Sequence, residues 1–228
     1  MVNVGTDLFY DAAGNITQYD ATSGDDTFLS YDARSNVQMI TVGTSAGTTT
    51  PTAREQFWYD PNGQRYLGLE TWDETGVQKQ LVTVYLGDYE VTGPPTGVSG
   101  DVVERVSASA AVQRIKKLDA WGGNQISIFS RHLHHDHLGS VDAVTNASGA
   151  VLGEKISFDP FGGRRESNWA SDIDAASMST LLANENSIYT RGFTDQGIWE
   201  GIWGQIYLSR RAEYGDGFIY LDVWGANA

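Results

Sequence analysis

Short runs of apolar and aromatic residues alternate with turn residues along most of the chain. The runs 8–10 and 56–59 are each followed by Asp, Asn and Gly positions and then by a second run. Gly and Asn supply the positive φ of tight turns, and an Asp at the first turn position can bond back to the backbone. The flanking Tyr, Trp, Phe, Val, Ile and Thr side chains suit a pleated sheet. The pattern predicts an all-β protein built from successive antiparallel hairpins.

The same pattern places the individual strands and loops. We expect strands over 8–10, 16–19, 56–59, 64–67, 82–85, 89–91, 125–129, 141–144, 150–152 and 155–158. The Thr/Gly/Ser-rich segment 41–53 and the Gly/Pro-containing segment 92–100 are predicted loops. At most one short helix is expected, over 172–182, where an acidic start precedes an apolar stretch.

A tyrosine–aspartate pair opens three related units, which begin at Tyr10, Tyr31 and Tyr59 with spacings of 21 and 28 residues. Each continues as Asp-x-x-Gly/Ser-Asn/Gln. A repeat of this length is typical of supersecondary units that bury their faces against their neighbours. The predicted turn residues of these units are Tyr10, Asp11, Gly14, Asn15, Tyr31, Asp32, Tyr59, Asp60 and Gly63.

Composition and charge exclude several classes of protein. With 15 Lys+Arg against 29 Asp+Glu, the net charge of −14 disfavours nucleic acid and anionic membrane surfaces as partners. The absence of cysteine excludes disulfides, thiolate metal sites and cysteine nucleophiles. The N-terminus has no signal-peptide pattern, and no run is long enough to span a membrane.

The candidate chemistry is sparse. All four histidines fall at His132, His134, His135 and His137. A strand would place two of them on each face, whereas a zinc site needs three or four converging ligands, so we favour a structural role. The segment 43–47 matches the Gly-x-Ser-x-Gly pattern, but 48–51 does not begin a helix, so a loop is favoured over a nucleophile elbow. We expect no enzymatic activity, metal or cofactor.

A longer pattern follows the histidines. Residues 134–140 read His-His-Asp-His-Leu-Gly-Ser, 158–162 read Phe-Asp-Pro-Phe-Gly, and 191–194 read Arg-Gly-Phe-Thr. Together with the tyrosine–aspartate units, this order resembles the Rhs/YD-repeat family and its repeat-associated core over about residues 8–194. The matching core positions are His134, Asp136, His137, Leu138, Gly139, Ser140, Asp159, Pro160, Phe161, Gly162, Arg191, Gly192 and Phe193. The resemblance implies structural roles for them, with Asp136 as a buried polar residue.

The resemblance implies a ribbon of hairpins in a twisted, spiralling sheet that forms part of a hollow shell around a C-terminal toxin. It divides the chain into a YD-repeat segment (1–90), the repeat-associated core (91–194) and a divergent tail (195–228). Many relatives cleave themselves in an aspartate-dependent reaction after this core. The only Asp-Pro pairs here begin at Asp60 and Asp159, neither at the family's cleavage position, so no cleavage site can be assigned.

The sequence therefore predicts a truncated, non-catalytic shell segment of a bacterial polymorphic toxin system. One alternative is a secreted or surface module that binds carbohydrate through exposed aromatic side chains. Another is an active self-cleaving core. The expected partners are further YD repeats or a toxin domain of the same system, together with an immunity protein or a secretion-apparatus component. The family implies secretion or a cell-surface location.

Overall fold

The computed structural model describes residues 8–19, 25–74, 76–109, 111–152, 157–158, 164–166, 168, 170–171, 198–201 and 204–207. Its strands are β1 (Leu8–Tyr10), β2 (Ile16–Tyr19), β3 (Asp26–Tyr31), β4 (Val37–Gly43), β5 (Ala53–Tyr59), β6 (Arg65–Glu74), β7 (Val77–Leu86), β8 (Tyr89–Gly93), β9 (Val102–Ser109), β10 (Val112–Leu118), β11 (Gln125–His135), β12 (Val141–Asn146), β13 (Ser157–Phe158), β14 (Arg164–Arg165), β15 (Ile198–Gly201) and β16 (Gly204–Tyr207).

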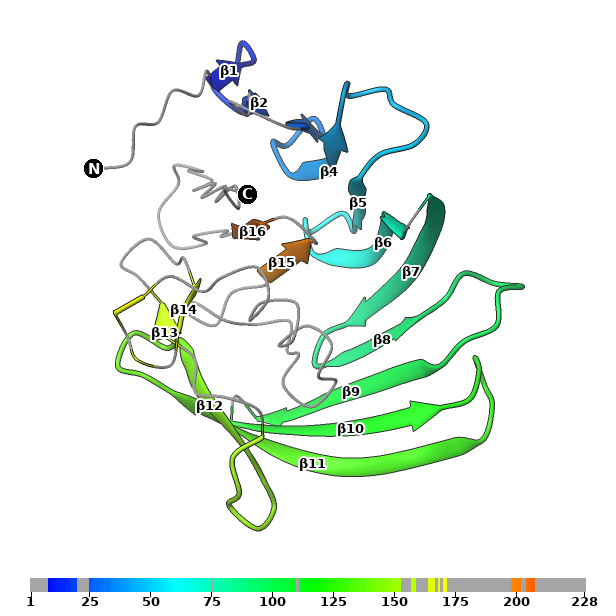
Figure 1. The fold of residues 1–228 in the computed structure, drawn as a ribbon, viewed down its shortest axis with the longest axis vertical. Helices are drawn as coiled ribbons and strands as arrows, with labels where there is room; N and C mark the ends of the chain where they lie inside the picture. The colour runs from blue at the N-terminus through cyan, green and yellow to red at the C-terminus, as the bar shows by residue number, and fades with distance from the viewer. Residues whose placement is uncertain are drawn as a thin grey trace. The chain divides into compact units, whose positions relative to one another are not determined.

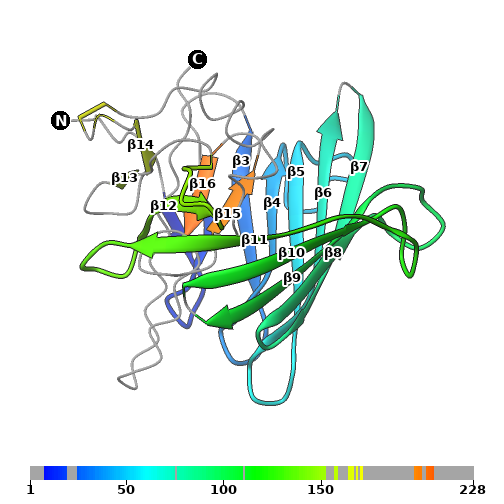
Figure 2. The same ribbon diagram turned by 90° about the horizontal axis from the view of Figure 1, so that it is seen from below.

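The first twelve strands form one sheet in which each strand lies beside the next one in the sequence, from β1 to β12 (Figures 1 and 2). The β13–β14 and β15–β16 pairs are separate two-stranded sheets. The strand pairs from β1 to β8 are all antiparallel. The predicted all-β class with successive hairpins is thus confirmed.

Helices are absent from the residues that the structure describes, so nothing there is a membrane-spanning helix. The predicted helix over 172–182 lies outside these residues. The predicted strand over 150–152 is wrong, because Val151 makes only an isolated bridge to Thr145. The loop predicted over 41–53 is shorter than expected, since β4 continues to Gly43 and β5 already begins at Ala53.

Strands β9 and β10 were not predicted from the sequence. Neither shows the strand period of two clearly, because β9 opens with two adjacent valines and Val112-Gln-Arg-Ile-Lys-Lys-Leu118 of β10 has its apolar residues at every third position. They lack the tyrosines that flank the repeats. Charged Lys116 and Lys117 pair with Glu104 and Asp101 at 3.1 and 2.8 Å.

The chain divides into two compact units, Met1–Glu104 with Lys116–Ser127, and Arg105–Ile115 with Ile128–Ala228. The first unit buries Leu29, Ile40 and Phe57 in β3–β5 and has a second cluster around Val91, Val102 and Leu118. Burial of such side chains is the main source of stability in a sheet of this kind.

The second unit has its own core. Leu133 of β11 packs with Val141 and Val144 of β12, and the partly buried Leu152 and Phe158 cover them. This cluster lies directly beside the histidine-rich segment, so packing fixes the position of the turn that follows β11.

Candidate functional site: the tyrosine–aspartate turns

The three tyrosine–aspartate units form hairpin turns with the same hydrogen bonds. In the first unit the Asp11 Oδ1 atom accepts bonds from the backbone N–H groups of Ala13 and Asn15, both at 2.9 Å. The Asn15 side chain donates to Asp11 Oδ2 at 2.8 Å. The backbone closes the turn, since the Asp11 N–H donates to the Asn15 carbonyl at 2.9 Å. One carboxylate therefore satisfies several turn donors at once.

Asp32 and Asp60 repeat this arrangement. Asp32 Oδ1 accepts from the N–H groups of Arg34 and Asn36 at 2.8 and 2.9 Å. Asp60 Oδ1 accepts from those of Asn62 and Gln64, both at 2.8 Å. The identical pattern shows that the sequence repeat is also a repeat of local structure.

These hydrogen bonds favour the charged carboxylate. Bonds donated by the Asn15 side chain and backbone lower the pKa of Asp11 below its ordinary value. Burial alone raises the pKa of Asp32, but the bonds donated by Asn36 and Arg34 outweigh it and leave that pKa lowered. The turns at Asp11 and Asp32 are therefore built around ionised aspartates at neutral pH.

The fourth turn position has a left-handed backbone in each unit. Gly14 and Gly63 have φ of +86° and +76°, and Ser35 occupies the same position with φ of +59°. Ser35 is the only residue other than glycine with positive φ among those the structure describes. This position explains why Gly recurs three residues after the aspartate.

The tyrosines join one repeat to the next. The Tyr31 hydroxyl donates to the Ile16 carbonyl at 2.7 Å, and the Tyr59 hydroxyl donates to the Val37 carbonyl at 2.6 Å. Each acceptor stands six residues after the tyrosine of the preceding repeat. We call these two bonds the tyrosine ladder. Burial and the nearby Asp11 charge raise the pKa of Tyr31 to about 12, so its hydroxyl remains a donor at neutral pH.

A register shift accompanies each of these tyrosines. The strand register slips between Phe9 and Tyr10, between Ser30 and Tyr31, and between Trp58 and Tyr59. A bulge changes the direction of a side chain at the end of a strand. In the second and third repeats the bulge lies at the tyrosine whose hydroxyl donates a hydrogen bond to the preceding hairpin.

The turns of successive repeats also touch one another. The Asn15 side chain donates to Ser35 Oγ at 3.3 Å, and the Arg34 guanidinium donates to the Pro61 carbonyl. The repeats are thus joined both by the tyrosine ladder and by contacts between their turns.

The histidine-rich motif contains a turn of the same design. Asp136 Oδ1 accepts from the N–H groups of Leu138 and Ser140, both at 2.8 Å, and Gly139 has φ of +86°. The resemblance implied a buried polar role for Asp136, whereas the structure places it, half-buried, at the first position of a hairpin turn. The spacing Asp-x-x-Gly-Ser was the signal that could have shown this.

In two further turns, the side chain of the first residue also accepts hydrogen bonds from backbone N–H groups of the turn. Asn146 Oδ1 accepts from the N–H groups of Ser148 and Ala150, both at 3.0 Å. Asp119 accepts from the Asn124 N–H at 2.7 Å in a turn that is one residue longer. Trp121 in that turn packs over Gly93 and donates to the Pro94 carbonyl at 2.7 Å, which ties two loops of the first unit together.

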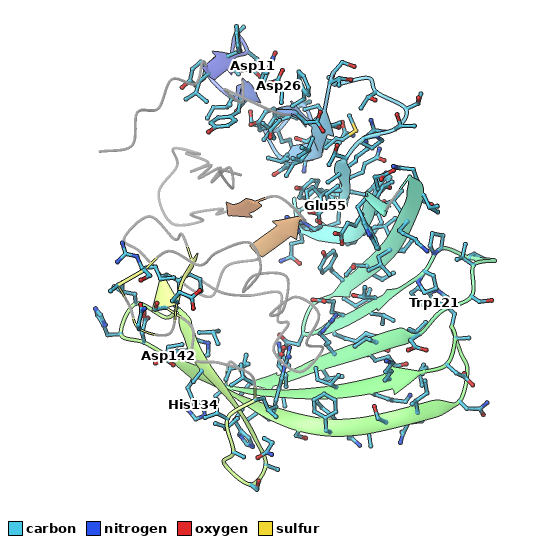
Figure 3. The ribbon with its side chains drawn as sticks, viewed as in Figure 1. Asp11, Asp26, Glu55, Trp121, His134 and Asp142 are labelled. Carbon is cyan, nitrogen blue, oxygen red and sulfur yellow. The ribbon has the colours of Figure 1, made fainter. Side chains whose placement is uncertain are left out.

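The histidines do not gather into a metal site within the described part of the chain, where no cluster of three metal-binding side chains occurs. His134 of β11, which is labelled in Figure 3, has its Nε2 atom 2.9 Å from Thr145 Oγ1. A register shift between His134 and His135 interrupts the strict alternation of faces, and His137 lies in the turn. Gly43 ends β4 and no helix follows it in the described segment up to β5, so the nucleophile elbow is not formed.

Other predicted core positions lie outside the described residues. These are Asp159, Pro160, Phe161, Gly162, Arg191, Gly192 and Phe193. Of the remaining positions, Ser140 is fully buried and Leu138 is exposed.

One residue of this region was not selected from the sequence. The Arg131 side chain is only 1% exposed, and its Nε and Nη2 atoms donate to Gln113 Oε1 at 3.0 and 2.8 Å. An arginine at an inward-facing position of a strand is rare unless it is hydrogen-bonded. Arg131 therefore holds β11 against β10 within the second unit.

The geometry defines a class of protein: an antiparallel hairpin-repeat sheet whose units are linked through tyrosine hydroxyls. No family model matches the chain, and no curated protein is similar to it in sequence. Solved structures do share the fold. The chain is similar to the crystal structure of TcdB2-TccC3 at 15% identity and a TM-score of 0.57, with 89% of this chain and 11% of the other covered.

Two further solved structures share the fold of this chain. A complex of TcdB2-TccC3-Cdc42 matches at 16% identity and a TM-score of 0.56, covering 93% of this chain and 12% of the other. A Photorhabdus luminescens Tc holotoxin pore matches at 15% identity and a TM-score of 0.54, covering 89% and 11%. The chain thus spans about a tenth of the length of these proteins. The likeness supports the Rhs-like fold that the sequence motifs predicted.

Proposed function

We propose that this chain is a non-catalytic structural segment of an Rhs/YD-repeat polymorphic toxin shell, which encloses or presents a C-terminal toxin. The tyrosine ladder carries the proposal, because it couples the second and third repeats to the repeat before them, as the units of a continuous wall require. Similarity to TcdB2-TccC3 and to a Tc holotoxin pore supports a toxin-system context. The segment from 91 to 194 would then serve as the repeat-associated core of this shell.

The free edge of β1 indicates which partner the segment needs. Leu8, Phe9 and Tyr10 are 44%, 46% and 57% exposed, and β1 ends the strand order of the sheet. The Tyr31 and Tyr59 hydroxyls donate to the carbonyls of Ile16 and Val37 in the preceding repeat. Within the described residues, the Tyr10 hydroxyl has no such acceptor. The missing acceptor is a carbonyl six residues after the tyrosine of a preceding unit. A further YD repeat is therefore the partner that fits this edge.

An open apolar edge strand makes the isolated chain prone to association. We expect sedimentation velocity to show oligomers of the full chain at micromolar concentration. Phe9→Lys places a charge on the edge strand and should shift the distribution towards the monomer. The control Val98→Lys alters an apolar residue that is also exposed, in the loop after β8, and should leave association unchanged. A stable wild-type monomer would contradict an open repeat edge.

A further inference from the structure

Two acidic residues face each other across the β5–β6 pair. The register places Glu55 directly opposite Glu70. On the outer sides of this pair, Ile40 of β4 lies opposite Glu55 and Leu81 of β7 lies opposite Glu70. The two carboxyl groups are thus neighbours in a cross-strand row whose other members are apolar. Like charges directly opposite one another destabilise a sheet.

The surroundings disfavour the ionised forms. The Glu55 Oε2 atom is shielded from solvent and has no hydrogen-bond partner in the described part of the protein. Burial raises the pKa of Glu55 well above its ordinary value, the charge of Glu70 raises it further, and Arg65 opposes this rise. Burial raises the pKa of Glu70 to about 7. Figure 3 shows Glu55 on its strand.

Arg65, the cation that opposes the rise in the pKa of Glu55, also contacts aromatic side chains. The Arg65 guanidinium lies 3.9 Å from the centroid of the Phe57 ring and 5.6 Å from that of Tyr85. It also shares hydrogen bonds with the hydroxyls of Tyr59 and Tyr85. One arginine held by three aromatic rings cannot also fully compensate two carboxylates.

Few charged side chains lie on the same face of the neighbouring strands. On β4 the neighbours that share the face of Glu55 are Ile40 and Val42, which do not titrate. On β7 the same face carries Leu81 and, two residues away, Lys79, which lies opposite Trp72 rather than either glutamate. Glu90 of β8 lies opposite Tyr85 and adds further negative charge.

We propose that Glu55 and Glu70 form a proton-dependent junction, which holds β5 and β6 together most firmly in mildly acid solution and weakens as the pH rises through neutrality. A carboxyl that binds its proton more tightly in the folded state stabilises that state at low pH. This stabilisation begins to be lost above the ordinary pKa of 4.5. For Glu70 the loss is complete somewhat above pH 7, and the raised pKa of Glu55 adds a loss in the same direction. The junction does not depend on the proposed shell function.

A carboxyl titration tests the junction directly. The full chain labelled with ¹³C at glutamate Cδ is titrated by NMR from pH 4 to pH 9. We expect one glutamate resonance with a midpoint near pH 7, which disappears in Glu70→Gln and thereby identifies the group. If every glutamate has its midpoint between about pH 4 and 5, as in unfolded peptides, the junction does not exist.

The effect on stability is a second, independent readout. We expect the thermal midpoint of the wild-type chain to fall by about 5–10 °C between pH 5 and pH 8. In Glu70→Gln this fall should be several degrees smaller, because the variant has no charge to develop at this position. Asp88→Asn removes a charge from the exposed β7–β8 turn and should retain the full pH dependence. A pH dependence that is equal in all three proteins would overturn the proposal.

Discussion

Replacement of Phe57 by Ala is expected to lower the free energy of unfolding of the first unit by about 3–5 kcal/mol. The Phe57 side chain is only 1% exposed, and it lies on the strand that carries the last tyrosine of the ladder. Its ring supports the Arg65 guanidinium at 3.9 Å and lies beside Gly68, where no side chain can fill the space left behind. The substitution therefore removes both buried apolar surface and a cation–π contact.

Urea denaturation followed by hydrogen exchange of the β5 amides measures this loss. The control is Val77→Ala, since Val77 lies exposed at the start of β7. We expect the control to change stability by no more than about 0.5 kcal/mol. A loss below about 1 kcal/mol for Phe57→Ala would show that β4–β6 do not pack as described.

Arg131→Ala is expected to destabilise the second unit by about 3–5 kcal/mol. The substitution opens a cavity at a fully buried position and removes both donors that Gln113 Oε1 accepts from. Arg131→Met should cost less, because it keeps most of the packed volume while losing the hydrogen bonds. The double variant with Gln113→Leu should recover part of the loss, since no polar atom is then left unsatisfied at that position.

Arg114→Ala is the matched control, because Arg114 is an exposed arginine next to Gln113 on the same strand. It should leave the free energy of unfolding unchanged within about 0.5 kcal/mol. Equal effects of Arg131→Ala and Arg114→Ala would contradict a structural role for the buried guanidinium.

Local chemistry made the turns predictable from the sequence. Asp11 and Asp60 each precede a glycine at a fixed spacing, and Asp32 precedes Ser35 at the same spacing, so the aspartate bonds could be expected without knowledge of distant contacts. The turn at Asp136 has the same spacing and could equally have been predicted from the sequence. The neighbouring histidines and the family resemblance directed the interpretation towards a buried polar role instead.

The links between hairpins could not be read in the same way. The bond from Tyr31 to the Ile16 carbonyl depends on the register between two hairpins and on a bulge before the tyrosine. The pairing of Glu55 with Glu70 depends in turn on the bulge at Tyr59, because a shift of one residue would move every side chain to the other face. These features follow from register, which periodicity alone does not determine.

The proposed ladder of tyrosine–aspartate repeats, formed by β1–β6, should accept another repeat at β1. It is tested most directly by hydrogen exchange and thermal denaturation of a variant in which a copy of residues 8–28, one full spacing of the repeat, is inserted before Leu8. In a repeat array each added unit contributes an interface with its neighbour. We predict a thermal midpoint several degrees higher and slowed exchange of the original Leu8–Tyr10 amides. An unchanged midpoint together with unprotected Leu8–Tyr10 amides would contradict the repeat account.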